Sequence, residues 1–158
     1  MSKYNILWVD DDIDMPELRA DKTALIEKEC NIIGFNTPDT FLDYINDNRN
    51  KPKDIDCIII DLSMPLTDKI KDKIKDKIML KKTLKGLATG HILLELIKDS
   101  QFKQTLITIY TITDNDEVKE YCKNNINIHY KNKLDYLSDE FADEIIKLIQ
   151  SYNILIKK

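Results

Sequence analysis

The sequence predicts an α/β fold in which helices cover both faces of a parallel sheet. Five short apolar runs alternate along the chain with segments whose apolar residues recur at helical spacing. The run Cys57–Ile60 is apolar at every position, which favours a strand that is covered on both sides. Strands that alternate with helices indicate βαβ units and therefore a doubly wound sheet.

Each strand is expected at a short run that is rich in apolar residues. These runs are Tyr4–Val9, Asn31–Phe35, Cys57–Ile60, Leu106–Tyr110 and Ile126–Tyr130. The first run stops at three successive acids, and the fifth stops at a lysine. Charged residues therefore stand where these strands should end.

The first two helices are recognised by the residues at their start. Pro16 suits the first turn of a helix that runs to about Cys30. Thr37 is expected to cap the second helix, with Pro38 at its first position. The apolar stripe of this second helix consists of Phe41, Leu42, Tyr44 and Ile45.

The later helices are recognised by capping and by periodicity. A short helix is expected at His91–Asp99, and Asp114 with Glu117 resembles a capping box that opens another. Apolar residues at helical spacing then predict a C-terminal helix. They are Leu134, Leu137, Phe141, Ile145 and Leu148.

The composition is typical of one folded domain. The chain has 158 residues, 42% of them apolar, so 1–158 is expected to form a single domain with a buried core. A net charge of −4 argues against nucleic-acid binding through a basic surface. No apolar run approaches the roughly 18 residues of a membrane span, and we find no signal peptide. Three widely spaced cysteines indicate core thiols, so we expect a cytoplasmic protein.

Chemically active side chains follow four of the expected strands. After the first, third, fourth and fifth strands stand Asp10–Asp12, Asp61, Thr111 and Lys131, respectively. Right-handed crossovers place the carboxyl ends of parallel strands at one edge of the sheet, where ligands bind. Each residue alone is typical of a cap, a turn or a surface position. Their combination at one edge is what predicts a site.

Carboxylates that crowd together at one edge point to a cation. They repel each other, and some stay protonated unless a positive charge balances them. Oxygen ligands that leave room for water favour Mg²⁺ over zinc. An aspartate beside Mg²⁺ can be the nucleophile toward a phosphoryl group, while a lysine and a hydroxyl hold the transferred oxygens.

The motifs at these positions resemble the receiver domain of bacterial two-component response regulators. The resemblance is carried by "ILWVDDD", "CIIIDLSMP", Thr89-Gly90, "LITIYT" and "IHYK", and it covers nearly the whole chain. It implies the flavodoxin-like sheet of order 2-1-3-4-5 that chemotaxis-regulator-like single domains share. It also implies phosphorylation on an aspartate and signalling by a phosphoprotein.

The resemblance implies a metal site. Asp61 matches the aspartate that becomes 4-aspartylphosphate. Asp10 and Asp11 match the acid pair that holds Mg²⁺, with Asp11 the closer ligand. Asp61 and the backbone carbonyl of Ser63 would complete the metal coordination.

The resemblance also implies a switch hydroxyl at Thr111 and a phosphate-contacting lysine at Lys131. The family usually has an aromatic residue three positions before that lysine, where Ile128 stands here, and a proline after it, where Asn132 stands. Counting from Lys133 instead places Tyr130 at the aromatic position. Strand polarity favours Lys131 and family spacing favours Lys133, so both stay open. The residue after Thr111 is normally small, whereas here it is isoleucine.

A charged repeat interrupts the family pattern after the third strand. The stretch "TDKIKDKIKDKIMLKK" lies within an insertion at about 66–89. Ile70, Ile74 and Ile78 recur every four residues, which favours a helix from about Asp68 to Lys85 that stops at Gly86. A solvated segment without helical order is the alternative. If it folds, its apolar stripe must pack on the domain or on a partner.

Together these features predict a phosphoryl-accepting receiver rather than a turnover enzyme. A histidine kinase or histidine phosphotransfer protein would phosphorylate Asp61 with Mg²⁺. We expect no output domain, so the signal would pass to a separate protein partner. One alternative is a pseudo-receiver that only binds partners. Another is a phosphohydrolase of the haloacid dehalogenase type, although Asp61-Leu62-Ser63 lacks the second aspartate of that motif.

Overall fold

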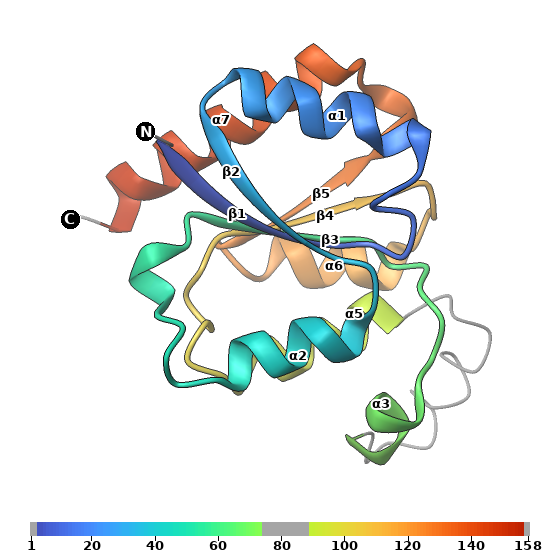
Figure 1. Cartoon of the computed structure of the whole chain (residues 1–158). Coiled ribbons are helices and arrows are strands. Elements are labelled where there is room, and N and C mark those ends of the chain that lie inside the picture. Colours follow the sequence, from blue (N-terminus) through green and yellow to red (C-terminus); the bar gives the residue numbers. More distant parts are fainter. Residues whose placement is uncertain (1–2, 74–88, 157–158) are drawn as a thin grey trace.

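The computed structural model describes residues 3–73 and 89–156. The fold is built around a five-stranded sheet (Figure 1). The strands are β1 (Tyr4–Val9), β2 (Cys30–Phe35), β3 (Cys57–Ile60), β4 (Ile107–Thr111) and β5 (Ile128–Asn132). Neighbouring strands pair in parallel in the order β2-β1-β3-β4-β5. The predicted doubly wound α/β fold and its strand order are confirmed.

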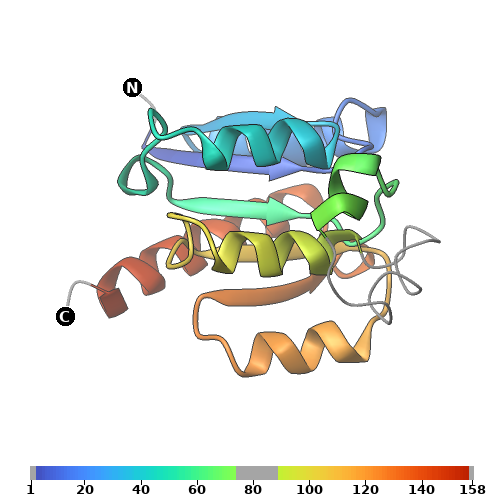
Figure 2. The same cartoon turned by 90° about the horizontal axis from the view of Figure 1, so that it is seen from below.

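Helices form a layer on each face of the sheet (Figure 1, Figure 2). One layer contains α1 (Pro16–Glu27) and α7 (Ser138–Ile156), and the other contains α2 (Pro38–Asn46), α5 (Thr89–Lys98) and α6 (Asp116–Lys123). Successive strand residues point to opposite faces. In β1, Leu7 therefore joins the core beside α2 and α5, whereas Trp8 joins the core beside α1 and α7.

Two helix starts show how far local patterns determine the boundaries. The Thr37 hydroxyl accepts a hydrogen bond from the Thr40 N–H at 3.2 Å, and the predicted start of α2 is confirmed. The predicted cap at Asp114 is wrong by one residue. Asn115 caps α6 instead, because its side-chain oxygen accepts from the Val118 N–H at 3.0 Å.

None of the described helices is both long enough and apolar enough to cross a membrane.

The C-terminal strand and helix both begin later than expected. β5 pairs with β4 through Thr111↔Asn132, so it runs two residues beyond Tyr130. As an edge strand it has one unpaired side, where polar residues are tolerated. The apolar run therefore ends before the strand does. The following helix starts at Ser138, and Leu134, which was expected on its apolar stripe, is 80% exposed.

The insertion after β3 is closed at its base. The Thr89 hydroxyl donates a hydrogen bond to the Met64 carbonyl at 2.6 Å, and the Gly90 N–H donates to the Leu62 carbonyl at 3.2 Å. These two bonds join the segment that follows β3 to the start of α5 (Thr89–Lys98), on either side of the insertion. Helix α3 (Asp68–Lys73) starts where predicted. The rest of the expected helix, including Gly86, lies outside the described residues.

Helix α3 packs against α2. The Ile70 side chain is fully buried in the core that α2 and α5 share. The Thr67 hydroxyl donates to the Asp39 carboxylate at 2.6 Å, and Lys69 forms an ion pair with Asp43. The first isoleucine of the repeat is therefore covered by the domain itself and is not free for a partner.

Candidate functional site

Three carboxylates meet at the carboxyl edge of the central strands. Asp10 and Asp11 follow β1, and Asp61 follows the neighbouring strand β3. One oxygen atom of each lies within 4.8 Å of the others. Asp10 and Asp61 are buried, whereas Asp11 is exposed, so solvent reaches the cluster from the Asp11 side.

A lysine lies against two of these acids. The Nζ atom of Lys133 donates hydrogen bonds to Oδ2 of Asp10 at 2.7 Å and to Oδ2 of Asp61 at 3.4 Å. The Lys133 side chain is only 14% exposed. It directly follows β5, so its long stem spans the width of β4 to reach the acids. One ammonium group thereby joins the ends of three strands.

The electrostatics of the cluster show an excess of negative charge. Burial and the nearby Asp61 carboxylate raise the pKa of Asp10 from 3.8 to about 6, against the lowering effect of Lys133. Burial, Asp12 and Asp61 likewise raise the pKa of Asp11. Burial lowers the pKa of Lys133, but its attraction to Asp10 and Asp61 outweighs this and raises it overall. One lysine therefore does not balance three acids, and a second cation would be favoured.

Backbone groups fix the orientation of the two buried carboxylates. The Asp12 N–H donates to Oδ1 of Asp10 at 2.9 Å, and the Ser63 N–H donates to Oδ1 of Asp61 at 3.2 Å. Each Oδ1 is thus held by the turn that follows its own strand. The Oδ2 atoms of both residues are the ones that accept from Lys133.

Thr111 is held in place by the loop that follows β4. Its buried hydroxyl accepts a hydrogen bond from the Thr113 N–H at 3.2 Å. The Thr113 hydroxyl lies 2.5 Å from the Ser63 hydroxyl, and the Tyr130 hydroxyl donates to the Thr113 carbonyl. Thr113 therefore links the loops after β3 and β4 to β5. Sequence reasoning missed it because no motif marked this position.

The expected position of Lys131 requires correction. Its Nζ atom donates to Glu144 of α7 at 3.0 Å instead of reaching the acids. Because β5 extends to Asn132, the residue that emerges at the carboxyl edge is Lys133. Family spacing had pointed to Lys133 and strand polarity to Lys131, and Lys133 is the lysine that lies against the acids. Ile112, which follows Thr111, is 61% exposed and does not fill the interior beside the acids.

Solved structures share this arrangement of strands and helices. A CheY-like receiver domain protein from Methanospirillum hungatei matches 96% of this chain and 98% of its own, with 16% identity and a TM-score of 0.65. The receiver domain of a Francisella response regulator matches 94% and 98%, with 20% identity and a TM-score of 0.62. Vibrio cholerae CheY4 matches 92% and 98%, with 17% identity and a TM-score of 0.60. No family model and no curated protein matches the sequence.

The chain has the fold of a response regulator receiver domain. The matches extend over nearly the full length of both chains, so the likeness concerns the whole architecture. The identities are low, and they establish the fold alone. The roles of individual residues have to be argued from the geometry of this chain.

In this receiver fold, Gly90 is a second residue whose role the sequence did not reveal. A Cβ atom at this position would lie 2.5 Å from the carbonyl oxygen of Asp61 and 2.8 Å from the Cα of Leu62. Both contacts are with backbone, which cannot move aside as a flexible side chain can. Glycine is therefore required where α5 meets the end of β3. The Thr89-Gly90 pair was visible in the sequence. The contact of Gly90 with Asp61 and Leu62 was not, because the insertion separates these residues along the chain.

The donor set at the edge of the receiver fold suits Mg²⁺. All three candidate side-chain ligands are carboxylates, and hard oxygen ligands are those that Mg²⁺ selects. Their oxygens lie within 4.8 Å of one another, and a small inward shift would bring them to the separation of at most about 4.2 Å that two oxygens have on one ion with bonds of about 2.1 Å. The excess negative charge also favours a divalent cation. Asp10, Asp11 and Asp61 therefore fit the predicted ion.

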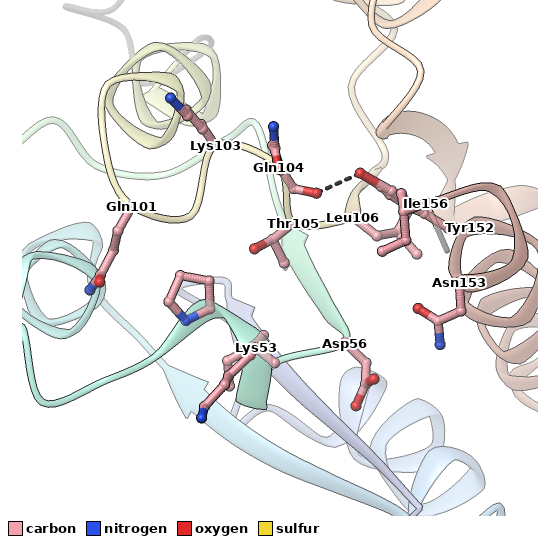
Figure 3. Close-up of a pocket in the computed structure, with 12 residues that line it drawn as sticks. Lys53, Asp56, Gln101, Lys103, Gln104, Thr105, Leu106, Tyr152, Asn153 and Ile156 are labelled. Carbon is pink, nitrogen blue, oxygen red and sulfur yellow. Dashed lines mark hydrogen bonds between the residues drawn. The ribbon is translucent and has the colours of Figure 1, made fainter. Parts of the chain in front are cut away.

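A half-open pocket of about 490 Å³ lies at the opposite edge of the sheet from these acids, lined by residues including Lys53, Asp56 and Thr105 (Figure 3). The Tyr152 hydroxyl closes one side by donating to the Gln104 carbonyl at 2.5 Å. This pocket holds none of the groups at the carboxyl edge.

Proposed function

We propose that this chain is a receiver domain that accepts a phosphoryl group on Asp61 in a Mg²⁺-dependent reaction. The donor is the phosphohistidine of a histidine kinase or a histidine phosphotransfer protein in the cytoplasm. The observation that carries the proposal is the contact of Lys133 with both Asp10 and Asp61, beside the exposed Asp11. The phosphorylated protein signals to a downstream protein partner. The protein does not act as a turnover enzyme in this proposal.

The chemistry assigned to Asp61 is a direct phosphoryl transfer. Its Oδ2 atom forms the new bond to phosphorus while the bond from phosphorus to the donor imidazole nitrogen breaks, and the electron pair stays on that nitrogen. The Ser63 N–H holds Oδ1 at 3.2 Å, and we therefore assign the attack to Oδ2. Mg²⁺ held by Asp10, Asp11, Asp61 and the Ser63 carbonyl would offset the charge on the phosphoryl oxygens.

Lys133 and Thr111 supply the remaining contacts in this proposal. The Lys133 ammonium already lies beside Oδ2 of Asp61 and donates to a phosphoryl oxygen after transfer. The Thr111 hydroxyl exchanges its bond from the Thr113 N–H for one to the phosphoryl group. Both changes are local, and they bias a two-state equilibrium that alters affinity for a partner.

The geometry favours this function over the two alternatives. A pseudo-receiver needs no lysine between two buried acids. Lys133 nevertheless forms ion pairs with Asp10 and Asp61, although burial of its charge costs free energy. A haloacid dehalogenase would carry an acid two residues after its nucleophile, where Ser63 binds Thr113 instead.

A small phosphodonor tests the proposal without a kinase. The protein is incubated with acetyl phosphate, with and without Mg²⁺, and its intact mass is measured. Wild type should gain one phosphoryl group only with Mg²⁺, and Asp61→Asn should gain none. Asp54→Asn removes an exposed acid at the opposite edge and should behave as wild type. Steady release of phosphate from a generic ester would support the phosphohydrolase instead.

A further inference from the structure

A third buried carboxylate, besides Asp10 and Asp61, lies between α1 and α7. Asp21 of α1 is 7% exposed, and its two oxygens accept from different hydroxyls. The Tyr110 hydroxyl donates to Oδ2 at 3.0 Å, and the Ser138 hydroxyl donates to Oδ1 at 2.6 Å. In the described part of the chain, no lysine or arginine forms an ion pair with Asp21. Burial of a carboxylate whose partners are hydroxyls costs free energy, because hydroxyls do not neutralise its charge.

Tyr110 connects this carboxylate to the site. It is the residue before Thr111, and its hydroxyl end reaches Asp21. The Lys133 ammonium lies over its ring, 5.8 Å from the centroid. The other packing of the ring is aromatic, since Phe141 of α7 stacks on it at 3.9 Å between centroids. Tyr110 is therefore a rigid spacer between Asp21 and Lys133, fixed at both its hydroxyl and its ring.

Ser138 anchors the same segment from its other end. Lys133 and Ser138 are the two ends of the connection between β5 and α7. Lys133 is bound to Asp10 and Asp61, and Ser138 is bound to Asp21. Between them, Leu134 and Leu137 are 80% and 74% exposed and contribute little burial. Tyr136 packs against the core between the two leucines, and the carboxylates hold the connection at its two ends.

We propose that Asp21, through Tyr110 and Ser138, is a positioning residue that fixes Lys133 for phosphoryl transfer to Asp61. The inference rests on the proposed function of Asp61 and extends it to a part of the molecule that does not touch the reacting atoms. Loss of the anchor leaves Lys133 in place on average but with a wider range of positions. Small displacements of a group that contacts the transferred oxygens slow transfer by large factors.

Tyr110→Phe is the first test, because it removes the hydroxyl and keeps the ring over Lys133. The rate of modification by acetyl phosphate should fall roughly tenfold. The matched control is Tyr152→Phe, which removes another tyrosine hydroxyl bond at the opposite edge of the sheet and should leave the rate unchanged. Ser138→Ala should slow the reaction as well, and Ser138→Thr, which restores a hydroxyl, should rescue it.

A double-mutant cycle separates positioning from a general loss of stability. In a Lys133→Met background, Tyr110→Phe should cause no further slowing, because the residue through which it acts is gone. Equal slowing with and without Lys133, or no slowing in Tyr110→Phe, would overturn the inference. If wild type is not modified at all, the proposed function fails. Amide hydrogen exchange in the unmodified protein then tests the positioning. Faster exchange at residues 133–138 in Tyr110→Phe, but not in Tyr152→Phe, would support the inference. Unchanged exchange in Tyr110→Phe would refute it.

Discussion

The ammonium group of Lys133 lies 2.7 Å from a carboxylate oxygen of Asp10, a residue with no exposed surface. Asp10 is attracted to Lys133 and repelled by the carboxylate of Asp61, which lies on the same edge of the sheet. Removal of the lysine therefore leaves two buried acids without a cation. In buried pairs such a loss costs on the order of 3 kcal/mol, although protonation of Asp10 limits it here.

Lys133→Met should have two measurable effects. The pKa of Asp10, now about 6, should rise because the lowering effect of Lys133 is lost. Carbon NMR titration of the aspartate carboxyl groups measures this. Modification by acetyl phosphate should also slow by roughly a hundredfold, since a charge that stabilises the transition state is gone. Lys131→Met is the control and should keep the wild-type rate, because Lys131 contacts Glu144 instead.

The raised pKa of Asp10 predicts how stability depends on pH in the absence of divalent ions. Its pKa is 3.8 unfolded and about 6 folded, so the folded state binds more protons between these values. This stabilising contribution is complete below about pH 4 and is lost as the pH rises through about 6. Asp10→Asn should therefore gain stability relative to wild type between pH 4 and 7 in EDTA, as measured by urea unfolding.

Mg²⁺ should reverse this trend. Because the ion replaces the proton on Asp10, the melting temperature at pH 7 should rise with millimolar Mg²⁺ and respond less at pH 5. Asp11→Ala should abolish the shift. Asp14→Ala should not, because that acid is exposed and forms an ion pair with Lys22, at 3.9 Å. Equal shifts in wild type and Asp11→Ala would place the bound ion elsewhere.

Gly90→Ala tests the contact between α5 and the end of β3. The added methyl group would meet the backbone of Asp61 at 2.5 Å, so the two segments must separate. We expect a loss of roughly 1–3 kcal/mol and slower modification of Asp61. Gly34→Ala is the comparison, because its Cβ would meet only the Ile13 side chain at 3.2 Å. A Gly90→Ala protein that reacts at the wild-type rate would show that this contact does not position Asp61.

Removal of part of the insertion tests whether it is needed for the chemistry. Replacement of residues 74–88 by a short Gly-Ser linker keeps helix α3 and Ile70, so the shortened protein should still fold and accept a phosphoryl group. A deletion that starts at Asp68 also removes Ile70 from the core and should cost roughly 2–5 kcal/mol. We expect the shorter replacement to change the preference among histidine kinases. An unchanged preference would make the repeat a passive part of the loop.

The sequence was informative wherever local pattern and topology agree. The apolar runs predicted five strands, and the acids after β1 and β3 were expected together because parallel strands end at one edge. Asp10, Asp11 and Asp61 are indeed neighbours. Whether they bind Mg²⁺ and accept a phosphoryl group stays a prediction.

The sequence was less informative where tertiary contacts decide. Lys131 looked like the end of β5 because polar residues usually end a strand, but an edge strand tolerates them on its open side. Gly90 and Thr113 are important through contacts with residues far away in the chain. The anchor at Asp21 joins three elements, and none of them carries a local signal for it.

The most direct test of the central claim is to identify the residue that carries the phosphoryl group. The protein is treated with acetyl phosphate and Mg²⁺, the acyl phosphate is reduced with borodeuteride, and the peptides are analysed by mass spectrometry. Reduction turns a phosphorylated aspartate into a deuterium-labelled alcohol at that residue alone. We predict a Mg²⁺-dependent label at Asp61 and none at Asp10 or Asp11. A label at another residue, or none under conditions where the protein is folded and binds Mg²⁺, would contradict the account.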